Sequence, residues 1–233
     1  MIAETITNVR SRVRLACARN GRAPEEVQIV AVSKTFGHAL VKEAYGAGVR
    51  DFGENYVQEL EEKRLQLSGL ALRWHFIGHL QSNKVKYIAP YVELIHSVDN
   101  LKLAQEIQKR GMQLGRILDI LIEVHTTDEA TKYGADPHDV PSLAKEIARM
   151  DHVRLQGLMT MGPFSDNPDD SRPSFRTVFD LKRMIEREGI EGVSMQRLSM
   201  GMTHDYEVAI EEGATIIRVG TAIFGPRAKP VAS

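Results

Sequence analysis

The chain has 233 residues, and its 30 lysine and arginine residues nearly balance its 31 aspartate and glutamate residues, for a formal net charge of -1. Charged residues make up 26% of the chain and hydrophobic residues 42%, which is typical of globular proteins and excludes a disordered chain. The balanced charge gives no broad basic face, so neither nucleic acid nor an anionic membrane is the expected partner.

The first segment is predicted to form an amphipathic helix that ends at Asn20 and Gly21. Its apolar residues recur at spacings of four and three, which places them on one side of a helix. A helix with such a stripe needs a surface to cover, so we expect it to pack on the body of the fold. The stripe consists of Ile2, Ile6, Val9, Val13 and Ala16.

The single cysteine, Cys17, also lies in this helix. One cysteine excludes an intrachain disulfide framework and is typical of a reducing compartment. The same segment lacks the apolar core of a signal peptide, and no apolar run approaches the ~18 residues of a membrane span. These features predict a cytoplasmic protein that does not cross a membrane.

Eight short apolar runs, each predicted to be a strand, alternate with segments of helical period in the rest of the chain. The near-continuous runs at 27–33 and 117–124 are typical of a parallel sheet covered on both faces. Eight such strands predict a (β/α)8 TIM barrel with an extra N-terminal helix, formed by residues 1–233 as one domain. A doubly wound open sheet is the alternative, although no G-x-G-x-x-G follows any strand. The other predicted strands are 49–53, 73–77, 94–98, 153–160, 195–199 and 215–219, and the clearest helical stripes lie within 57–67, 103–114, 143–150 and 175–185.

Lys34 follows the first predicted strand, where an apolar run meets its loop. Partial removal of water from an ammonium lowers its pKa and frees the amine as a nucleophile, for which a Schiff base is the natural use. The alternative is a structural lysine whose stem leaves the strand end for solvent. In a TIM barrel this strand end belongs to the ligand-binding face.

The last two predicted strands end in turns that combine glycine with hydroxyl groups. Glycine permits close approach of a ligand, and backbone N–H groups beside hydroxyls suit a phosphate. The loops after strands seven and eight are the usual phosphate site of this barrel, and we expect them to lie opposite Lys34. Thr203 is also a candidate cap for the next helix, whose N-terminus would add a favourable dipole. The alternative is two ordinary glycine turns. The residues are Ser199, Gly201 and Thr203 in the first turn, and Gly220 and Thr221 in the second.

Two further polar residues are candidates for this site. Arg218 lies in an otherwise apolar strand, where a charge is costly unless it meets a carboxylate or a ligand atom. Asn55 follows the second strand and either orients a ligand or caps the next helix.

The histidines do not predict a metal site. His75 and His79 have the four-residue spacing of a metal pair on a helix, but they lie in a predicted strand without a third ligand. His96 ends the fourth strand and is interpreted as a polar residue that lines the barrel. The stretch 163–173, rich in Pro, Asp and Ser, predicts a mobile loop at the rim.

Eight segments between residues 27 and 225 carry a further signal when they are taken in chain order. They are AVSKT, FGENYVQE, WHFIGHLQSNK, SVDN, TKYG, GLMTMGP, LSMGMTHDYEVAI and IRVGTAIFG. Together these segments resemble the YggS/PROSC family of pyridoxal-phosphate-binding homeostasis proteins. That family is similar in fold to the barrel domain of bacterial alanine racemases and to the N-terminal domain of eukaryotic ornithine decarboxylases.

The resemblance implies a role for each candidate residue. Lys34 would form an internal aldimine with pyridoxal 5'-phosphate (PLP), Arg218 would lie near the pyridine nitrogen, and Asn55 would lie beside the ring. The chain departs from the family at Thr203, where serine is frequent, and at Phe36-Gly37, where many members have proline. The second departure affects the expected shape of the first loop, not the aldimine. The implied phosphate ligands are Ser199, Gly201, Thr203, Gly220 and Thr221.

The resemblance further implies a carrier of PLP that maintains vitamin B6 homeostasis, with no catalytic residue and no metal. PLP-dependent apoenzymes are the expected partners, and a monomer is the expected state. An arginine at the pyridine nitrogen leaves that nitrogen unprotonated and weakens the ring as an electron sink. The alternatives are a weak PLP-dependent amino-acid racemase and a cofactor-free Schiff-base aldolase that acts on a sugar phosphate.

Overall fold

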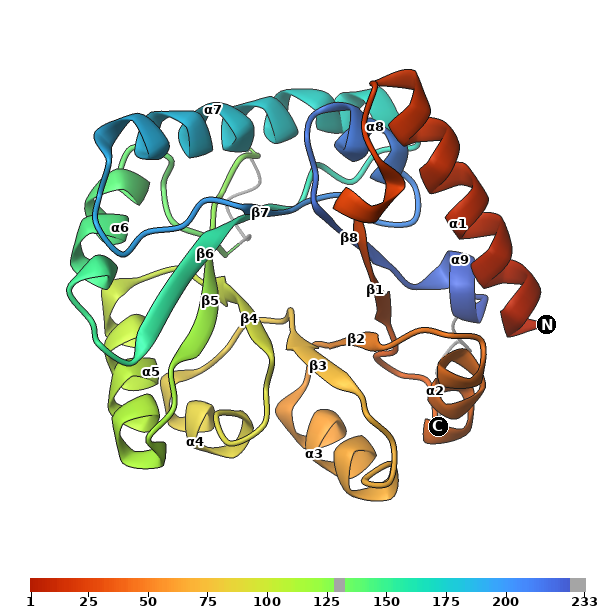
Figure 1. Ribbon diagram of the computed structural model, residues 1–233, viewed down its shortest axis with the longest axis horizontal. Helices are drawn as coiled ribbons and strands as arrows, with labels where there is room; N and C mark the ends of the chain where they lie inside the picture. Colours follow the sequence, from red (N-terminus) through yellow and green to blue (C-terminus); the bar gives the residue numbers. More distant parts are fainter. Residues whose placement is uncertain (128–132, 227–233) are drawn as a thin grey trace, which may run out of the picture.

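The strands close into a parallel eight-stranded barrel, which confirms the predicted fold. The computed structural model describes residues 1–127 and 133–226, and Figure 1 shows the strands inside an outer ring of helices. Each strand pairs with the next along the chain and β8 pairs with β1, so the alternative of an open sheet is wrong. The strands are β1 (Gln28–Val32), β2 (Asp51–Glu54), β3 (Arg73–Phe76), β4 (Leu94–Val98), β5 (Leu118–Glu123), β6 (Val153–Met159), β7 (Arg197–Ser199) and β8 (Ile216–Val219).

The extra N-terminal helix is α1 (Ile2–Arg19), which packs against α2, α8 and α9 and thereby covers the junction of β1 and β8. It buries the predicted apolar stripe together with Cys17, whose thiol has a pKa raised by burial. The other helices are α2 (His38–Gly46), α3 (Val57–Gln66), α4 (Val85–Ile88), α5 (Leu101–Leu114), α6 (Val140–Ala148), α7 (Arg172–Glu188), α8 (Tyr206–Glu211) and α9 (Thr221–Phe224), with short 3-10 helices at Pro24–Glu26, Ser82–Lys84 and Pro168–Ser171.

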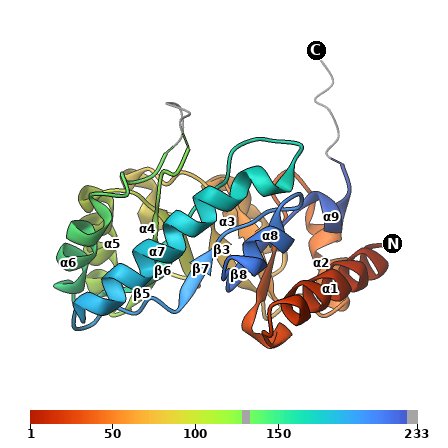
Figure 2. The ribbon, with the colours of Figure 1, turned by 90° about the horizontal axis from the view of Figure 1, so that it is seen from above.

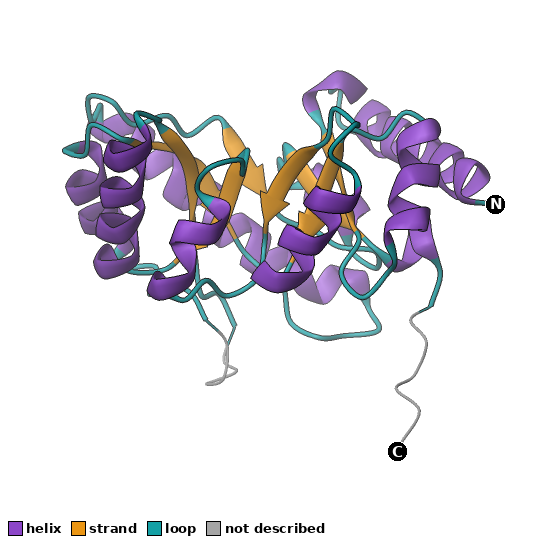
Figure 3. Ribbon diagram, turned by 90° about the horizontal axis from the view of Figure 1, so that it is seen from below, coloured by secondary structure: helices purple, strands orange, loops and turns teal. Residues whose placement is uncertain are grey.

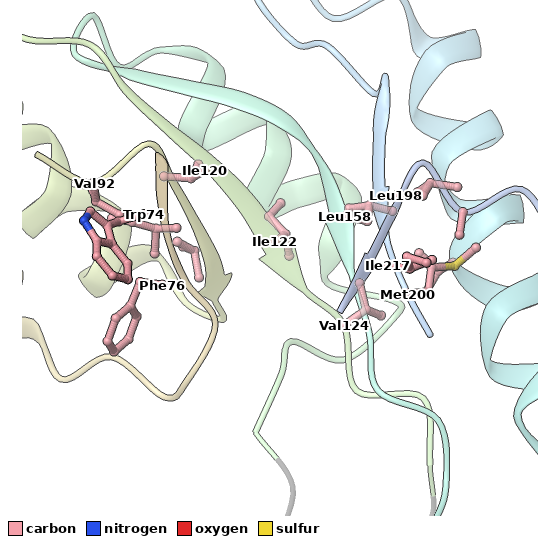
Figure 4. Packing of buried hydrophobic residues seen from close by; sticks show 14 of the residues in the cluster. Trp74, Phe76, Val92, Ile120, Ile122, Val124, Leu158, Leu198, Met200 and Ile217 are labelled. Carbon is pink, nitrogen blue, oxygen red and sulfur yellow. The ribbon is translucent and has the colours of Figure 1, made fainter. Parts of the chain in front are cut away.

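The core has two layers because strand residues alternate between the two faces of the barrel wall. The outer layer fills the space between strands and helices. In Figure 4, Ile120 and Ile122 of β5 point into this layer, as do Trp74 and Phe76 of β3. The intervening residues face the barrel interior, where a small apolar cluster forms the inner layer. It consists of Val30, Leu94, Leu121, Met159 and Ile216.

Because the strands are parallel, their carboxyl ends all lie at the same end of the barrel, which we call the mouth (Figure 3). The segment 163–173 rises at this end before it enters α7 (Figure 2) and contains the 3-10 helix Pro168–Ser171. Its rim position is as expected, and its mobility stays a prediction. None of the helices within the described residues combines the length and the apolar character that crossing a bilayer requires.

Candidate functional site

Lys34 lies directly beyond β1, in a tight turn at the mouth. The N–H of Phe36 closes this turn by donating to the C=O of Ser33 at 3.0 Å. Thr35 has a φ of 70°, a left-handed conformation that a β-branched residue rarely adopts and that costs about 1–3 kcal/mol. Its N–H donates to a carboxylate oxygen of Glu59 at 2.6 Å, which helps to hold the strained backbone. Lys34 itself is half-buried.

A buried group of side chains holds this turn from behind; we call Ser33, Glu54, Glu59 and Lys63 the Lys63 cluster. Lys63 Nζ donates to the C=O of Ser33 at 2.6 Å and to Oε1 of both glutamates at 2.7 Å. The Ser33 hydroxyl donates to Glu54 Oε1 at 2.6 Å. Burial raises the pKa of Glu54, and the neighbouring Lys63 ammonium opposes this increase. The cluster therefore ties α3 and β2 to the backbone of the Lys34 turn.

The turn after β8 lies beside Lys34 rather than opposite it. For this turn the expectation of an opposite position is wrong, because β8 pairs directly with β1 in the closed barrel. A Cβ on Gly220 would lie 3.4 Å from the C=O of Val32, and the rings of Phe36 and Phe224 are 5.2 Å apart. The turn after β8 therefore begins next to the strand end that carries Lys34.

Thr203 joins the two turns. Its Oγ1 accepts from the N–H of Ala222, in the first turn of α9, at 3.4 Å. The additional expectation that Thr203 caps the next helix is wrong, because the N-cap position of α8 is Asp205. Thr203 is half-buried, Gly220 is half-buried and Thr221 is exposed, so all three are accessible from the mouth.

Gly201 is required by packing of the chain itself. Its φ is +85°, and a Cβ there would lie 2.5 Å from the Cβ of Ala209 and 2.8 Å from the Cα of Tyr206. Both neighbours belong to α8. The absence of a side chain at Gly201 therefore allows α8 to pack closely against this turn. Asp205 holds the same turn by accepting from the N–H of Met202 at 2.6 Å.

Arg218 points into the barrel and is 3% exposed. Its Nη1 donates to the backbone oxygen of Ser199 at 2.7 Å and to Ser199 Oγ at 2.8 Å, and its Nη2 donates to the C=O of Thr160 at 2.9 Å. Within the described residues it has no ion pair, and burial lowers its pKa to about 10 although Asp205 and Glu123 oppose this change. A fully buried guanidinium without a contacting carboxylate is expected where a ligand completes the site.

Ser199 and Asn55 also lie inside the fold. Ser199 is fully buried, and its hydroxyl contacts Arg218 and His96 rather than the mouth. Asn55 is half-buried, and its Oδ1 lacks a hydrogen-bond partner among the described residues. The alternative that Asn55 caps a helix is wrong, because α3 has Tyr56 at its N-cap.

The histidines of the sequence analysis are divided between the barrel interior and the surface. No group of three metal-binding side chains occurs within residues 1–127 and 133–226. His96 lines the barrel interior as expected, 0% exposed and in contact with the equally buried His75. His79 instead stacks on Tyr133 at the surface, with ring centroids 3.7 Å apart. Thr131 and Lys132 of the segment TKYG lie outside the described residues.

Two features of the site escaped the sequence analysis. The first is the Lys63 cluster, whose only local signal is the i, i+4 pair of Glu59 and Lys63 on a helix. The second is Glu123, which ends β5 and is 4% exposed. Burial, with a smaller effect from Asp99, raises the pKa of Glu123 to about 7. The sequence does carry a signal for Glu123, which is an acidic residue at the end of a buried apolar strand.

Comparison with known proteins places the chain in a family. The family model for the alanine racemase N-terminal domain matches residues 8–228. The pyridoxal phosphate homeostasis protein of Aquifex aeolicus is 45% identical over 224 residues, which cover 96% of this chain and 97% of that protein. The protein of the same name from Pseudomonas aeruginosa is 42% identical over 226 residues, which cover 97% and 96% of the two chains.

Solved structures agree in fold. PipY of Synechococcus elongatus with PLP bound has a TM-score of 0.86 and 34% identity, over 97% of this chain and all of PipY. An alanine racemase of Clostridium difficile has a TM-score of 0.75 at 14% identity, which shows the fold alone; the match covers 98% of this chain but 58% of that one. By sequence and by fold, the chain belongs to the YggS/PROSC family of pyridoxal phosphate homeostasis proteins, within the larger family of alanine racemase N-terminal domains.

Proposed function

We propose that this chain binds PLP at the barrel mouth through Lys34 and serves PLP homeostasis as a carrier. The observation that carries the proposal is the placement of a half-buried lysine beside the turn of Gly220 and Thr221, above a buried arginine that lacks an ion pair among the described residues. Its relatives are named for PLP homeostasis, and PipY has been solved with PLP bound.

The residues at the mouth fit this cofactor group by group. When bound, PLP supplies an aldehyde that links covalently to an amine, an electron-accepting ring and a dianionic phosphate. Lys34 Nζ provides the amine. The N–H groups and hydroxyls of Thr203, Gly220 and Thr221, with the turn backbone at Gly201, suit the phosphate. Arg218 donates toward the ring nitrogen, and the unpartnered Asn55 Oδ1 accepts a polar group beside the ring.

We assign Ser199 to Arg218 rather than to the phosphate directly. Its hydroxyl is fully buried, and its two neighbours are Arg218 and His96. Removal of the Ser199 hydroxyl would therefore affect PLP binding through Arg218. The phosphate would be held by the accessible N–H groups and hydroxyls at the mouth.

Arg218 affects which chemistry a bound PLP would support. Its pKa of about 10 keeps the guanidinium charged at neutral pH, so it donates a hydrogen bond to the ring nitrogen without transferring the proton. An unprotonated ring nitrogen draws electrons weakly, which limits carbanion chemistry. Purified protein should racemise common amino acids no faster than free PLP does. Turnover well above that rate would support the weak racemase instead.

The linkage is tested by borohydride reduction of the PLP-loaded protein, followed by peptide mapping. The mass of the reduced adduct should lie on Lys34. Lys34→Ala should lose the visible absorbance of the lysine-linked cofactor, whereas Lys42→Ala, on the exposed side of α2, should keep it. A label on another lysine would overturn the assignment, and a protein that gains no visible band with PLP would leave the cofactor-free aldolase as the remaining hypothesis.

The phosphate assignment predicts a loss of affinity. The double variant Thr203→Val/Thr221→Val removes two hydroxyls with little change in volume. Since a hydrogen bond to a charged group contributes roughly 1.5–3 kcal/mol, the dissociation constant for PLP should rise at least about tenfold. Equilibrium dialysis measures this change, with Thr177→Val on the exposed surface of α7 as control. Equal retention of PLP by the double variant would place the phosphate elsewhere.

We further propose a cytoplasmic, single-domain monomer of residues 1–233 that passes PLP to apoenzymes. The accessible mouth supports transfer, since Thr221 is exposed and Thr203 is half-buried. Sedimentation analysis of the loaded protein should give the mass of one chain. The loaded protein should restore the activity of a PLP-dependent apoenzyme when the two are mixed. The reference is the Thr203→Val/Thr221→Val variant, which releases the same concentration of PLP into solution. Activity should return faster with the loaded protein than with PLP released by the variant.

A further inference from the structure

A continuous line of buried polar side chains crosses the barrel interior below the mouth. Asp51 Oδ1 lies 3.1 Å from His75 Nε2, and His75 Nδ1 lies 2.9 Å from His96 Nε2. His96 Nδ1 lies 2.8 Å from Ser199 Oγ, which accepts from Arg218 Nη1 at 2.8 Å. Asp51 is 6% exposed, Arg218 is 3% exposed, and the three residues between them are 0% exposed. We call these five residues the polar chain.

The polar chain spans the barrel from one wall to the other. It starts at the first residue of β2, passes through β3 and β4, and crosses the interior to β7 and β8. At its start, Arg73 holds Asp51 with two contacts of 2.7 and 2.6 Å. The chain therefore joins the end of the barrel opposite the mouth to the arginine that lies under the site.

The two ends of the polar chain determine where its protons lie. An arginine only donates and a carboxylate only accepts. A neutral His75 that donates from Nε2 to Asp51 must accept at Nδ1, so His96 donates from Nε2. His96 then accepts at Nδ1 from the Ser199 hydroxyl, whose oxygen accepts from Arg218. All four contacts are satisfied in this direction with both histidines neutral.

The reverse direction is disfavoured by an unsatisfied donor. If His96 donated from Nδ1 to Ser199, the hydroxyl proton of Ser199 would have no acceptor among the described residues, inside a fully buried site. Burial also holds the pKa of His96 well below its usual range, so this ring is neutral.

Proton transfer along the polar chain is excluded by the acidities of its ends. The pKa of Arg218 is about 10, whereas hydrogen bonds from Arg73 and His75 hold the pKa of Asp51 below its usual value, about 4, against the effect of burial. A guanidinium is a far stronger base than a carboxylate, and this order is kept here, so the proton stays on Arg218. The chain is thus a fixed structural link and not a proton conductor.

Arg218 is oriented at the end of this link. Three of its five N–H groups are used by Ser199 and Thr160. Its Nε–H and the second N–H on Nη2 have no acceptor among the described residues. Because the guanidinium is planar, three fixed contacts set its plane and hence the direction of the other two donors.

We propose that Asp51, His75, His96 and Ser199 are positioning residues that orient Arg218 toward the acceptor atom of a ligand bound at the mouth. This inference rests on the proposed function, in which that acceptor is the ring nitrogen of PLP. None of the four residues needs to contact the ligand. They act by keeping the Ser199 oxygen in place as the acceptor for Arg218.

The direction of the polar chain is tested in protein without PLP. Nitrogen-15 labelling of histidine, with proton–nitrogen NMR spectra, reports which ring nitrogen carries the hydrogen. We expect His75 and His96 to be neutral and to carry hydrogen on Nε2. A charged His75, or an Nδ1–H form of His96, would overturn the assigned direction whether or not the protein binds PLP.

The positioning role is tested by two variants of one residue. His96→Asn places a side-chain oxygen near the former Nδ1 and keeps the contact with Ser199, whereas His96→Gln places a nitrogen near the former Nε2 and keeps the contact with His75. If orientation passes through Ser199, His96→Gln should raise the PLP dissociation constant about fivefold or more, the effect of one lost hydrogen bond, and should shift the visible absorbance maximum. His96→Asn should change both less.

The outcomes separate this inference from the proposed function. Equal affinity and equal spectra for wild type, His96→Asn and His96→Gln would overturn the positioning role and leave PLP binding intact. Failure of the wild type to bind PLP would overturn the proposed function, while the NMR result would still decide the direction of the polar chain. His152→Gln, a half-buried residue far along the chain from these contacts, serves as control. If His96→Gln does not fold, Ser199→Ala in the same binding and absorbance measurements takes its place.

Discussion

Replacing Lys63 with methionine is expected to lower the free energy of unfolding by about 3–5 kcal/mol, because it leaves the carboxylate of Glu54 buried without its cation. Lys63 is 4% exposed and Glu54 is 0% exposed, so solvent does not compensate for the loss. The same change removes the donor to the C=O of Ser33. Urea denaturation measures the stability. Lys145→Met, which removes an exposed ion pair with Glu188, should change it by no more than about 1 kcal/mol.

The loss should depend on pH in a definite direction. Burial already raises the pKa of Glu54 in the folded protein, and removal of the Lys63 ammonium raises it further. A group whose folded pKa is raised favours the folded state at low pH and loses that contribution as pH rises through the folded value. The deficit of Lys63→Met should therefore be smaller at pH 5 than at pH 8. The double variant Lys63→Met/Glu54→Gln should recover part of the stability, and no recovery would show that the buried charge is not the cause.

The same variant tests how the strained Lys34 turn is held. Thr35 adopts a φ of 70° while its N–H donates to Glu59, and Lys63 contacts Glu59 from the other side. Without Lys63 the turn loses one of its two supports. Among molecules that remain folded, Lys63→Met should link PLP to Lys34 more slowly than wild type, as followed by the visible absorbance. An unchanged rate would limit the Lys63 cluster to a role in stability.

Replacing Glu123 with glutamine is expected to stabilise the PLP-free protein by about 4 kcal/mol at pH 8. Glu123 has a pKa of about 7 in the folded protein, against about 4.3 in an unfolded chain. Folding therefore takes up a proton at this site, and the associated stability is complete below pH 4 and is lost as pH rises through about 7. Each pKa unit corresponds to about 1.4 kcal/mol, which gives this magnitude.

The measurement compares denaturation of wild type and Glu123→Gln between pH 5 and pH 8. The two curves should converge at the acidic end, where Glu123 is protonated, and separate as pH rises. Glu191→Gln, an exposed residue, should follow the wild type at every pH. Parallel curves for wild type and Glu123→Gln would mean that this carboxyl titrates in the folded protein as it does in the unfolded chain.

Glu123 also bears on the ligand site. It is one of the two carboxylates whose charge acts on the buried Arg218 without contacting it as an ion pair. Ionisation of Glu123 above pH 7 therefore adds negative charge near the guanidinium when Arg218 has no ligand. This long-range balance differs from the polar chain, which acts on Arg218 by direct hydrogen bonds.

The sequence by itself determined the architecture and the strand ends that bear the candidate residues. Apolar runs and helical stripes are local patterns, and eight of them in alternation leave few closed arrangements other than a barrel. The position of Lys34 directly after β1, and of Gly220 and Thr221 directly after β8, follows from the same local patterns. Helices α4 and α9 have four residues each, too few to produce a helical period, and the patterns did not reveal them.

Only the tertiary structure decided which of these residues meet. His96 and Ser199 are 103 residues apart in the chain, and their contact depends on how far neighbouring strands are staggered around the barrel. Closure of the barrel also put the turn after β8 beside Lys34, because β8 pairs with β1, and it directed the Ser199 hydroxyl toward Arg218 instead of the mouth. The φ of 70° at Thr35 is likewise non-local in origin, because residues on β2 and α3 hold it in place. Local sequence reports which face of a strand a residue occupies, whereas packing of the closed barrel selects its partner across the interior.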